Sequence, residues 1–493
     1  MTWALGRPAA PGRPTRRQLL AGVAALSVAP SAAGCSLDGA PTPSVATWWQ
    51  HRGSRFFIAH RGSGDVFPEH SLPAYEGALT WGAPAIEVSV VRASDGVLFC
   101  QHDLDFRRTT TSQGLASQTT WAALADVRIE IPRLGPRWLG DRRPGLARLD
   151  TVLTRLGHKT VVVLEAKDPE AFEPMLALVV ELGVQSCVMC KLHQSSRRIP
   201  RAREAGLPVF CYFGAPEEVT ADRLVEVGAT LNREQDLLVI PTGDGDNALP
   251  DPLVAAAVAT GIPVCVFPVH RRSEVDYFAA RGVQGFVTSS YGYVAGAVAP
   301  VTATEWEQGA IAPGEMTVRP ELAEFGLAWP GSGVVQLAAQ DRMAFLTLGQ
   351  LAPLARPTAY RLDLQVRVDR APADGGPVEV AFGHPDDRYY ESGQGRLDGY
   401  HALLGMDGSL QLGRHQAGNR AGMPLAATVP GPALTVGTWV PLRLDVTPDT
   451  MTWSRMDTGA AVTGHDATLR GSYLHVGRAS TTGLISLRGL RIS

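Results

Sequence analysis

The feature that most constrains the fold is an alternation, between residues 56 and 290, of short apolar runs with longer mixed segments. Each run has the length of a buried strand, and segments between them, such as "EAFEPMLALVVELG", have helical spacing. The runs are "FFIA", "AIEVSV", "VLFC", "VVVLEA", "CVMC", "VFCYF", "LLVI", "PVCVF" and "GFVT". Strand followed by helix, repeated over roughly 240 residues, predicts an α/β fold and suits a (β/α)8 TIM barrel.

One connection in this barrel, predicted to span residues 55–298, is irregular. Only "VRASDG" separates the second run from the third, which is too short for the helix that joins parallel strands. We therefore expect a distorted barrel, in which one of the nine runs is an edge strand or part of a loop.

Beyond residue 300 the pattern becomes that of antiparallel strands. The segment "TAYRLDLQVRVD" alternates strictly, and "HALLGMDGSLQLGRH" has Asp407-Gly408 at the turn of a hairpin. The apolar side chains on one face of the first segment are Leu362, Leu364, Val366 and Val368. The pattern predicts an antiparallel β-sandwich (jelly-roll) domain over residues 305–493, with Trp439 and Trp453 in its core.

The N-terminal segment is typical of export. "TRRQLLAGVAALSVAPSAAGCS" has paired arginines and then a short apolar run, too short for a membrane anchor, which predicts a twin-arginine signal over residues 1–34. "AAGC" resembles a lipoprotein processing site, so Cys35 is a candidate lipid anchor. Residues 35–54 are predicted to form a tether. We expect an extracellular or cell-envelope protein.

The overall charge and the cysteine content exclude few further classes of function. The formal net charge is −3, so no basic surface suggests a nucleic-acid partner. Apart from Cys35, the cysteines lie in apolar runs and are predicted to be buried small side chains. Cys187-Val-Met-Cys190 also has the spacing of a redox or zinc motif, and a disulfide stays open.

The tetrapeptide HRGS occurs twice, beginning at His51 and at His60. In a parallel barrel, functional side chains lie at the C-terminal ends of strands. His60 directly follows the run "FFIA", whereas His51 lies in the predicted tether. We therefore interpret His60, with Arg61 and Gly62, as functional, and His51 as a surface residue.

Two strands carry carboxylates on the face that points into the barrel. Glu87 and Ser89 share one face of "AIEVSV", and Glu165 and Lys167 share one face of "VVVLEAKD". A buried carboxylate is costly unless it is paired or ligated. Either Glu165 pairs with Lys167, or the two glutamates hold a metal or form a catalytic pair; oxygen ligands suit Mg²⁺ or Ca²⁺.

His102 follows the third apolar run and could join His60 in one site. Two imidazoles can act as general base and general acid across one leaving group. Arg61 and Lys167 add positive charge. Together with a divalent cation, these groups predict a site for a phosphate diester.

The order of these motifs resembles the glycerophosphodiester phosphodiesterase family, in the phospholipase-C-like superfamily. The family pattern is HRG, PEN-S/T, Glu-x-Asp, DG, HD with R-T-T, and a later Glu-x-Lys. This chain carries HRG at 60–62, PEHS at 68–71, EVS at 87–89, DG at 95–96, HD at 102–103, RTT at 108–110 and EAK at 165–167. The resemblance covers about residues 56–290.

The resemblance implies roles for individual residues. It makes His60 and His102 the acid–base pair, and Arg61 and Lys167 the phosphate contacts. The implied metal ligands are Glu87, Glu165 and Ser89. Ser89 stands where the family has Asp, which weakens the expected metal site, and Lys191 stands where the family has Ser and could compensate as a phosphate contact.

The implied activity is that of an exported, metal-dependent phosphodiesterase. It would hydrolyse glycerophosphodiesters to an alcohol and sn-glycerol 3-phosphate, and a sphingomyelinase-D-like enzyme would differ mainly in head group. "DGYHALLGMDGSLQLGRH" and "TWVPLRLDV" resemble concanavalin-like modules, which implies possible glycan or cell-wall contact.

Two other classes of function stay open. Ser89 in place of a metal-ligand Asp favours a non-catalytic binder of phosphodiesters or envelope polymers. A glycosidase could use Glu87 and Glu165 as its carboxylate pair, although it would need neither His60 nor His102.

Overall fold

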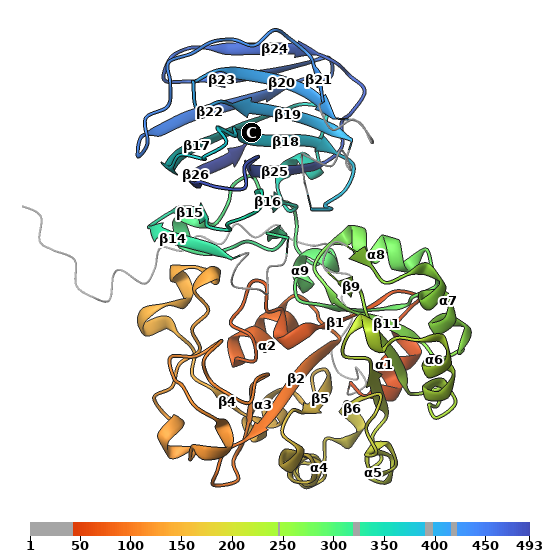
Figure 1. Cartoon of the computed structure of the whole chain (residues 1–493). Coiled ribbons are helices and arrows are strands. Elements are labelled where there is room, and N and C mark those ends of the chain that lie inside the picture. Colours follow the sequence, from red (N-terminus) through yellow and green to blue (C-terminus); the bar gives the residue numbers. More distant parts are fainter. Residues whose placement is uncertain (1–42, 245–246, 319–325, 390–397, 416–421) are drawn as a thin grey trace, which may run out of the picture. The chain divides into compact units, whose positions relative to one another are not determined.

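The computed structural model describes residues 43–244, 247–318, 326–389, 398–415 and 422–493 (Figure 1). The predicted export signal and Cys35 lie outside the described residues. Over the described ranges, no helix is both long enough and apolar enough to cross a membrane.

Residues 56–288 form a closed parallel barrel. Its strands are β1 (Phe56–Ala59), β2 (Ala85–Arg92), β5 (Val161–Ala166), β6 (Val188–His193), β7 (Val209–Tyr212), β8 (Leu237–Pro241), β11 (Val264–Val269) and β12 (Gly285–Thr288). They are hydrogen-bonded in the order β1-β12-β11-β8-β7-β6-β5-β2, and pairing of Ala59 with Ile86 closes the ring. The predicted TIM barrel is confirmed.

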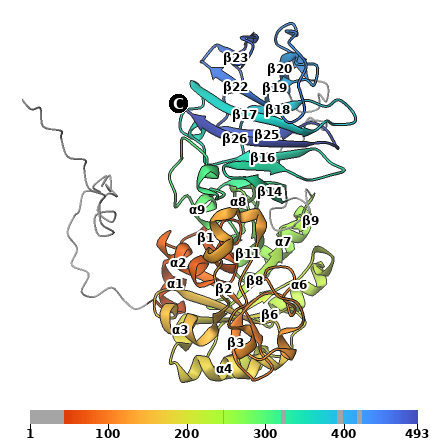
Figure 2. The same cartoon turned by 90° about the vertical axis from the view of Figure 1, so that its left-hand side faces the viewer.

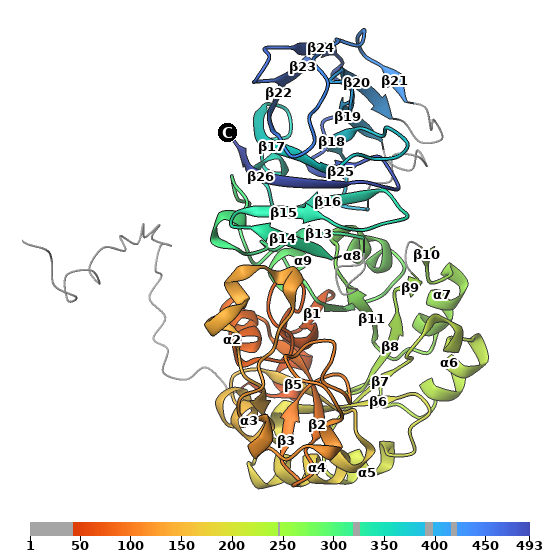
Figure 3. The same cartoon turned by 60° about the vertical axis from the view of Figure 1, so that its left-hand side comes forward.

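Helices surround these strands, as Figure 3 shows. They are α2 (Leu72–Thr80), α3 (Leu149–Leu156), α4 (Phe172–Glu181), α5 (Ile199–Glu204), α6 (Ala221–Gly228), α7 (Asp251–Ala259), α8 (Arg272–Ala279) and α9 (Tyr291–Val294). Each of the longer helices buries one apolar stripe against the sheet; in α3, Leu149, Val152, Leu153 and Leu156 are buried. A short hairpin, β9 (Gly243–Asp244) with β10 (Asn247–Ala248), precedes α7.

The expected distortion lies after β2. Strand β3 (Leu98–Cys100) returns antiparallel to β2, with Cys100 opposite Val90, and β4 (Ala147–Arg148) pairs with β3. The run "VLFC" is therefore the irregular one, as the short connection required, but it is not the edge strand: it lies outside the closed ring, between β2 and the edge strand β4. Because β2 extends past its parallel neighbours, the return strand brings the chain back to the level of Ser89, whose carbonyl accepts from Gln101 N at 3.0 Å.

The predicted tether is wrong in its second half. Helix α1 (Val45–His51) is capped at its N-terminus by Ser44, whose hydroxyl accepts from Thr47 N at 3.0 Å. Trp48 is buried and packs edge-on against Phe56, with ring centroids 5.3 Å apart. The aromatic pair thus attaches the segment to the barrel through hydrophobic burial instead of leaving it extended.

The C-terminal strands form two seven-stranded antiparallel sheets, which Figure 2 shows as facing layers. One sheet contains β13 (Glu315–Met316), β16 (Ala344–Leu348), β25 (Tyr473–Arg478), β18 (Val378–His384), β19 (Gly399–Leu404), β20 (Leu410–His415) and β21 (Met423–Pro424). The other contains β14 (Leu327–Gly331), β15 (Val334–Leu337), β26 (Leu484–Ile492), β17 (Tyr360–Arg370), β22 (Trp439–Val446), β23 (Thr450–Arg455) and β24 (Ala461–His465). The predicted β-sandwich is confirmed.

Side-chain burial in the sandwich follows the sequence pattern with one exception. Strand β17 alternates buried and less buried residues, and Trp453 is fully buried. Trp439 is not in the core: it is partly exposed, and Arg367 and Arg488 stack on its ring at 4.7 and 4.1 Å. Contact with a glycan through this domain stays a prediction.

The cysteines agree with the interpretation as buried apolar side chains. Those that the structure describes are Cys100, Cys187, Cys190, Cys211 and Cys265, and all five are free and buried. They therefore contribute to packing.

Candidate active site

The strand ends of the barrel surround a cavity of about 330 Å³, which is large enough for a small ligand. It is lined by His60, Arg61, Gly64, Asp65, Glu69, His102, Arg133, Lys167, Lys191, Tyr212, Gly214, Phe267, Pro268 and Ser289. Four predicted site residues therefore lie on one cavity: His60, Arg61, His102 and Lys167. The exposed His51 of α1 does not line it.

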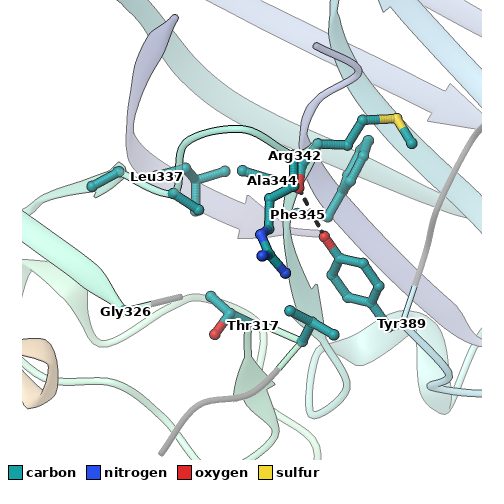
Figure 4. Close-up of a pocket in the computed structure, with 11 residues that line it drawn as sticks. Thr317, Gly326, Leu337, Arg342, Ala344, Phe345 and Tyr389 are labelled. Carbon is teal, nitrogen blue, oxygen red and sulfur yellow. Dashed lines mark hydrogen bonds between the residues drawn. The ribbon is translucent and has the colours of Figure 1, made fainter. Parts of the chain in front are cut away.

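A second cavity, near the start of the sandwich, is much smaller. Figure 4 shows it between Thr317, Leu337, Phe345 and Tyr389, where the Tyr389 hydroxyl donates to Met343 O at 3.0 Å. Its volume of about 10 Å³ is near the minimum for one water molecule. The cavity at the barrel mouth is thus the better candidate for an active site.

His60 lies directly after β1, where the neighbouring strand β12 fixes its ring. Ala59 pairs with Thr288, which brings Ser289 beside His60, and His60 Nδ1 lies 2.7 Å from Ser289 Oγ. Burial, followed by the charge of Arg61, holds the pKa of His60 well below its usual value. His60 is therefore a neutral imidazole, and its Nε2 is the nitrogen available to a substrate.

The turn after His60 is built from left-handed backbone conformations. Arg61, Gly62 and Ser63 have φ values of 54°, 77° and 74°. Such conformations are uncommon for residues other than glycine and persist where surrounding contacts hold them. Here Arg61 N donates to Glu87 Oε2 at 3.0 Å, and Arg61 O accepts from His70 N at 3.1 Å. The strained turn aims the Arg61 side chain at the cavity.

His102 follows the return strand β3 and is held by its neighbour in the sequence. His102 Nδ1 donates to Asp103 Oδ1 at 2.7 Å, and Arg108 Nε donates to Asp103 Oδ2 at 2.5 Å. Burial lowers the pKa of His102, and the hydrogen bond to Asp103 opposes this. Asp103 therefore orients the ring and favours its protonated form, as a general acid requires.

Glu69 lines the cavity and connects Arg61, which also lines it, with Arg108. Its carboxylate accepts from Arg61 Nη1 at 3.1 Å and from Arg108 Nη2 at 2.7 Å. Burial opposes its charge, but the two guanidinium groups outweigh burial and hold the pKa of Glu69 well below its usual value. Glu69, Asp103 and Arg108 belong to the motifs that the sequence shows, but the motifs do not indicate that Glu69 bridges two arginines or that Arg108 also contacts Asp103.

The predicted metal ligands also come together, but around an ammonium group. Lys191, in β6, places Nζ 2.8 Å from Glu87 Oε1 and 2.6 Å from Glu165 Oε2. The hydroxyl of Ser89 donates to Glu87 Oε1 at 3.4 Å. Lys167 Nζ lies 2.8 Å from Glu165 Oε1, so the pairing that the sequence left open is present.

These contacts determine the charge of the two glutamates. Burial opposes ionisation of both, yet Lys191 holds the pKa of Glu87 well below its usual value, and Lys191 with Lys167 lowers that of Glu165 to about 2. Both side chains are therefore carboxylates. In the same cluster, burial lowers the pKa of Lys191, but the two carboxylates raise it by more. The pKa of Lys191 therefore lies above its usual value.

As they lie, these residues do not fit a divalent cation. One oxygen of Glu87 and one of Glu165 face Lys191 Nζ, and Ser89 hydrogen-bonds to Glu87. Among the residues that the structure describes, no group of three or more His, Cys, Asp or Glu side chains could hold a metal ion. The predicted ligand set thus needs correction, because a lysine from the neighbouring strand fills its centre.

Comparisons with known proteins cover the barrel. The model of the glycerophosphoryl diester phosphodiesterase family matches residues 60–292. A Mycobacterium tuberculosis protein named probable glycerophosphodiester phosphodiesterase 1 is 30% identical over 251 residues, which are 47% of this chain and 88% of that protein. A glycerophosphodiester phosphodiesterase of Caldanaerobacter subterraneus is 26% identical over 47% of this chain and 92% of its own length.

Among solved structures, an Oleispira antarctica phosphodiesterase in complex with the product sn-glycerol-3-phosphate is 21% identical, with a TM-score of 0.40. The match covers 49% of this chain and 95% of the Oleispira chain. The family match begins at His60 and includes every residue of the cavity described above. From the sequence match to nearly the whole of the mycobacterial relative, we conclude that the chain belongs to the glycerophosphoryl diester phosphodiesterase family.

Proposed function

We propose that this protein hydrolyses glycerophosphodiesters to an alcohol and sn-glycerol 3-phosphate, with His60 and His102 as its acid–base pair. The observation that carries the proposal is one cavity lined by both imidazoles together with Arg61, Lys167 and Lys191. Cationic groups of this kind stabilise the charge that develops on the non-bridging oxygens of a phosphodiester. The name of the family and that of the mycobacterial relative support the choice of substrate.

The proposed reaction transfers two protons. One histidine removes the proton from the nucleophile as its oxygen bonds to phosphorus. The nucleophile is either water or a neighbouring substrate hydroxyl; in the second case a cyclic phosphate forms, and water opens it in a second step to give sn-glycerol 3-phosphate. The bond from phosphorus to the leaving oxygen breaks, and the other histidine protonates that alkoxide. Asp103 favours the protonated form of His102, which suits this ring to be the acid. His60 lies beside the neutral Ser289 and its pKa is held low, which suits it to be the base.

The repeated HRGS tetrapeptide offers a matched control for a test. The full chain is assayed with glycerophosphocholine, glycerophosphoethanolamine and glycerophosphoglycerol, and sn-glycerol 3-phosphate is measured by a coupled assay. His60→Ala should lose at least about 100-fold in kcat, because a general acid or base is removed. His51→Ala changes the same tetrapeptide at an exposed position of helix α1 and should keep full activity. Equal activity of the two variants would contradict the proposal.

A non-catalytic binder is the second candidate. Ser89 and the ion-paired Lys191 favour it, because the site lacks the cation cage that the motif implies. Saturable binding of glycerophosphocholine in calorimetry, without product, would identify the binder.

The glycosidase alternative loses support from the same contacts. A glycosidase needs one carboxylic acid that is protonated near neutral pH. Glu87 and Glu165 share Lys191, and the pKa of each is lowered, so neither suits that role.

We place this activity outside the cytoplasm, on the basis of the twin-arginine signal over residues 1–34 and the candidate lipidation site at Cys35. Mass spectrometry of the mature N-terminus tests both points. A lipid-modified Cys35 should appear in the membrane fraction and be lost in Cys35→Ala, whereas an intact signal on cytoplasmic protein would contradict export.

A further inference from the structure

We infer that the ammonium group of Lys191 is the resident cation of this site, in the position that a divalent metal ion would take between Glu87 and Glu165. The phosphate is then bound by ammonium and guanidinium groups of the chain alone. This inference rests on the proposed function for its catalytic part, and the metal-binding part stands on the structure by itself.

The contacts of Lys191 resemble those of a bound ion. Its Nζ lies within hydrogen-bond distance of carboxylate oxygens from two different strands, at 2.8 Å from β2 and 2.6 Å from β5. The side chain is only 7% exposed, while the two carboxylates are 0% and 5% exposed. A metal ion bound to the same two oxygens would have to displace the ammonium group.

The charges of the cluster balance without a metal. Two carboxylates, Glu87 and Glu165, face two ammonium groups, Lys191 and Lys167, and Ser89 is neutral. Adding a divalent ion would leave two excess positive charges in a buried region, where like charges repel strongly. With Ser89 in place of an acid, a singly charged cation is the one that this cluster can neutralise.

The position of Lys191 is fixed by its strand. Lys191 pairs with Phe210 in the register of β6 and β7, and its Nζ lies 4.8 Å from the centroid of the Tyr212 ring. Tyr212 in turn donates to Glu165 Oε1 at 2.7 Å. Since Lys191 also lines the cavity, its remaining ammonium proton can reach a phosphate oxygen.

The use of lysine in the whole sequence points the same way. Lysine occurs only at positions 159, 167 and 191, while the remaining basic residues are arginine. Two of these three lysines lie in this cluster. A guanidinium is a broad planar fork, whereas an ammonium is a compact charge, so a position that mimics a metal ion requires lysine.

A metal titration tests the inference without reference to turnover. The full chain, stripped with EDTA and dialysed, is titrated with MgCl₂, CaCl₂ and MnCl₂ in a calorimeter. We expect no stoichiometric binding below millimolar concentration. One-site binding that Glu87→Gln abolishes would overturn the inference, whether or not the protein proves to be an enzyme.

A double variant, Ser89→Asp with Lys191→Ala, tests the converse. It restores a third carboxylate and removes the ammonium, so it should gain one Mn²⁺ site in the same titration. Circular dichroism verifies that the variant is folded. A folded double variant that binds no cation would overturn the inference, because the surrounding oxygens would then not form a cation site.

The catalytic part is tested with a matched pair of lysine variants. Hydrolysis by the wild type should be unchanged by EDTA and by added Mg²⁺ or Ca²⁺. Lys191→Met should lose at least about 100-fold in kcat, as expected when a fixed charge at a developing oxyanion is removed. The exposed Lys159→Met should retain full activity. Wild-type activity that EDTA abolishes would overturn the inference, whereas a wild type inactive under all conditions would refute only the proposed function.

Discussion

Replacing Lys191 by methionine should destabilise the protein in a way that depends on pH. Methionine keeps the approximate volume of the lysine stem but removes the charge between Glu87 and Glu165. The two carboxylates would then remain buried, with Glu87 losing the ammonium that holds its pKa low. Breaking a buried ion pair from one side costs about 3–5 kcal/mol of unfolding free energy.

The sign of the pH dependence follows from the pKa of each state. In the wild type, Glu165 has a folded pKa of about 2, so its contribution to stability is present above its unfolded pKa and is lost as pH falls towards 2. In Lys191→Met, burial dominates at Glu87 and its pKa rises above the unfolded value. Acid then protonates Glu87 and relieves the penalty. The deficit of the variant should therefore be largest near pH 7 and smaller at pH 4.

Thermal and urea unfolding at pH 7 and pH 4 measure this deficit. At pH 7, a loss of about 3–5 kcal/mol corresponds to a decrease in Tm of roughly 6–20 °C for a domain of this size. Lys159→Met, an exposed lysine, should stay within about 0.5 kcal/mol of the wild type. A deficit for Lys191→Met that is below about 1 kcal/mol, or that is equal at both pH values, would refute the ion cluster.

Three further predictions concern the acid–base pair and the turn between them. Asp103→Asn removes the negative partner of His102 and should lower kcat about 100-fold with little change in KM, because it orients the ring without touching substrate; a change confined to KM would contradict this. The profile of kcat/KM against pH should have its maximum on the acid side of the ordinary histidine pKa of about 6.5, because burial lowers the pKa of both His60 and His102; a maximum above pH 8 would show that these rings do not control the rate. Gly62→Ala places a methyl group 2.9 Å from the backbone of α2 at a φ of 77° and should cost about 1–3 kcal/mol in urea unfolding. Gly82→Ala, with φ of 80° and open space, isolates the conformational part of that cost.

Much of the barrel and part of the site could be predicted from the sequence. Apolar runs predict the strands, and a polar residue at the end of a run predicts a position at the mouth of the barrel. His60 is such a residue, because it directly follows "FFIA". The short connection after "AIEVSV" also identified β3 as irregular. These features follow from local pattern and chain length alone.

What the sequence could not show is which charged side chains meet. Lys191 follows an apolar run like any strand-end lysine, and its reach to Glu87 depends on barrel closure and side-chain direction. The bridging role of Glu69 likewise depends on a loop that folds back from Arg108. The helix α1 was missed because a single buried tryptophan in a short polar segment gives no periodic signal.

The return strand β3 also determines where the chain can accept inserted residues without moving His102. The tip of the β2–β3 hairpin, residues 93–97, lies beyond the ladder that pairs Val90 with Cys100. Extra residues inserted there would disturb the hydrogen bonds of Ser94 and Asp95 to residues 119 and 121 but leave His102 where it is. One residue inserted between Cys100 and His102 would instead rotate the imidazole away from the cavity at the barrel mouth. Natural length variation in this hairpin should therefore collect at its tip.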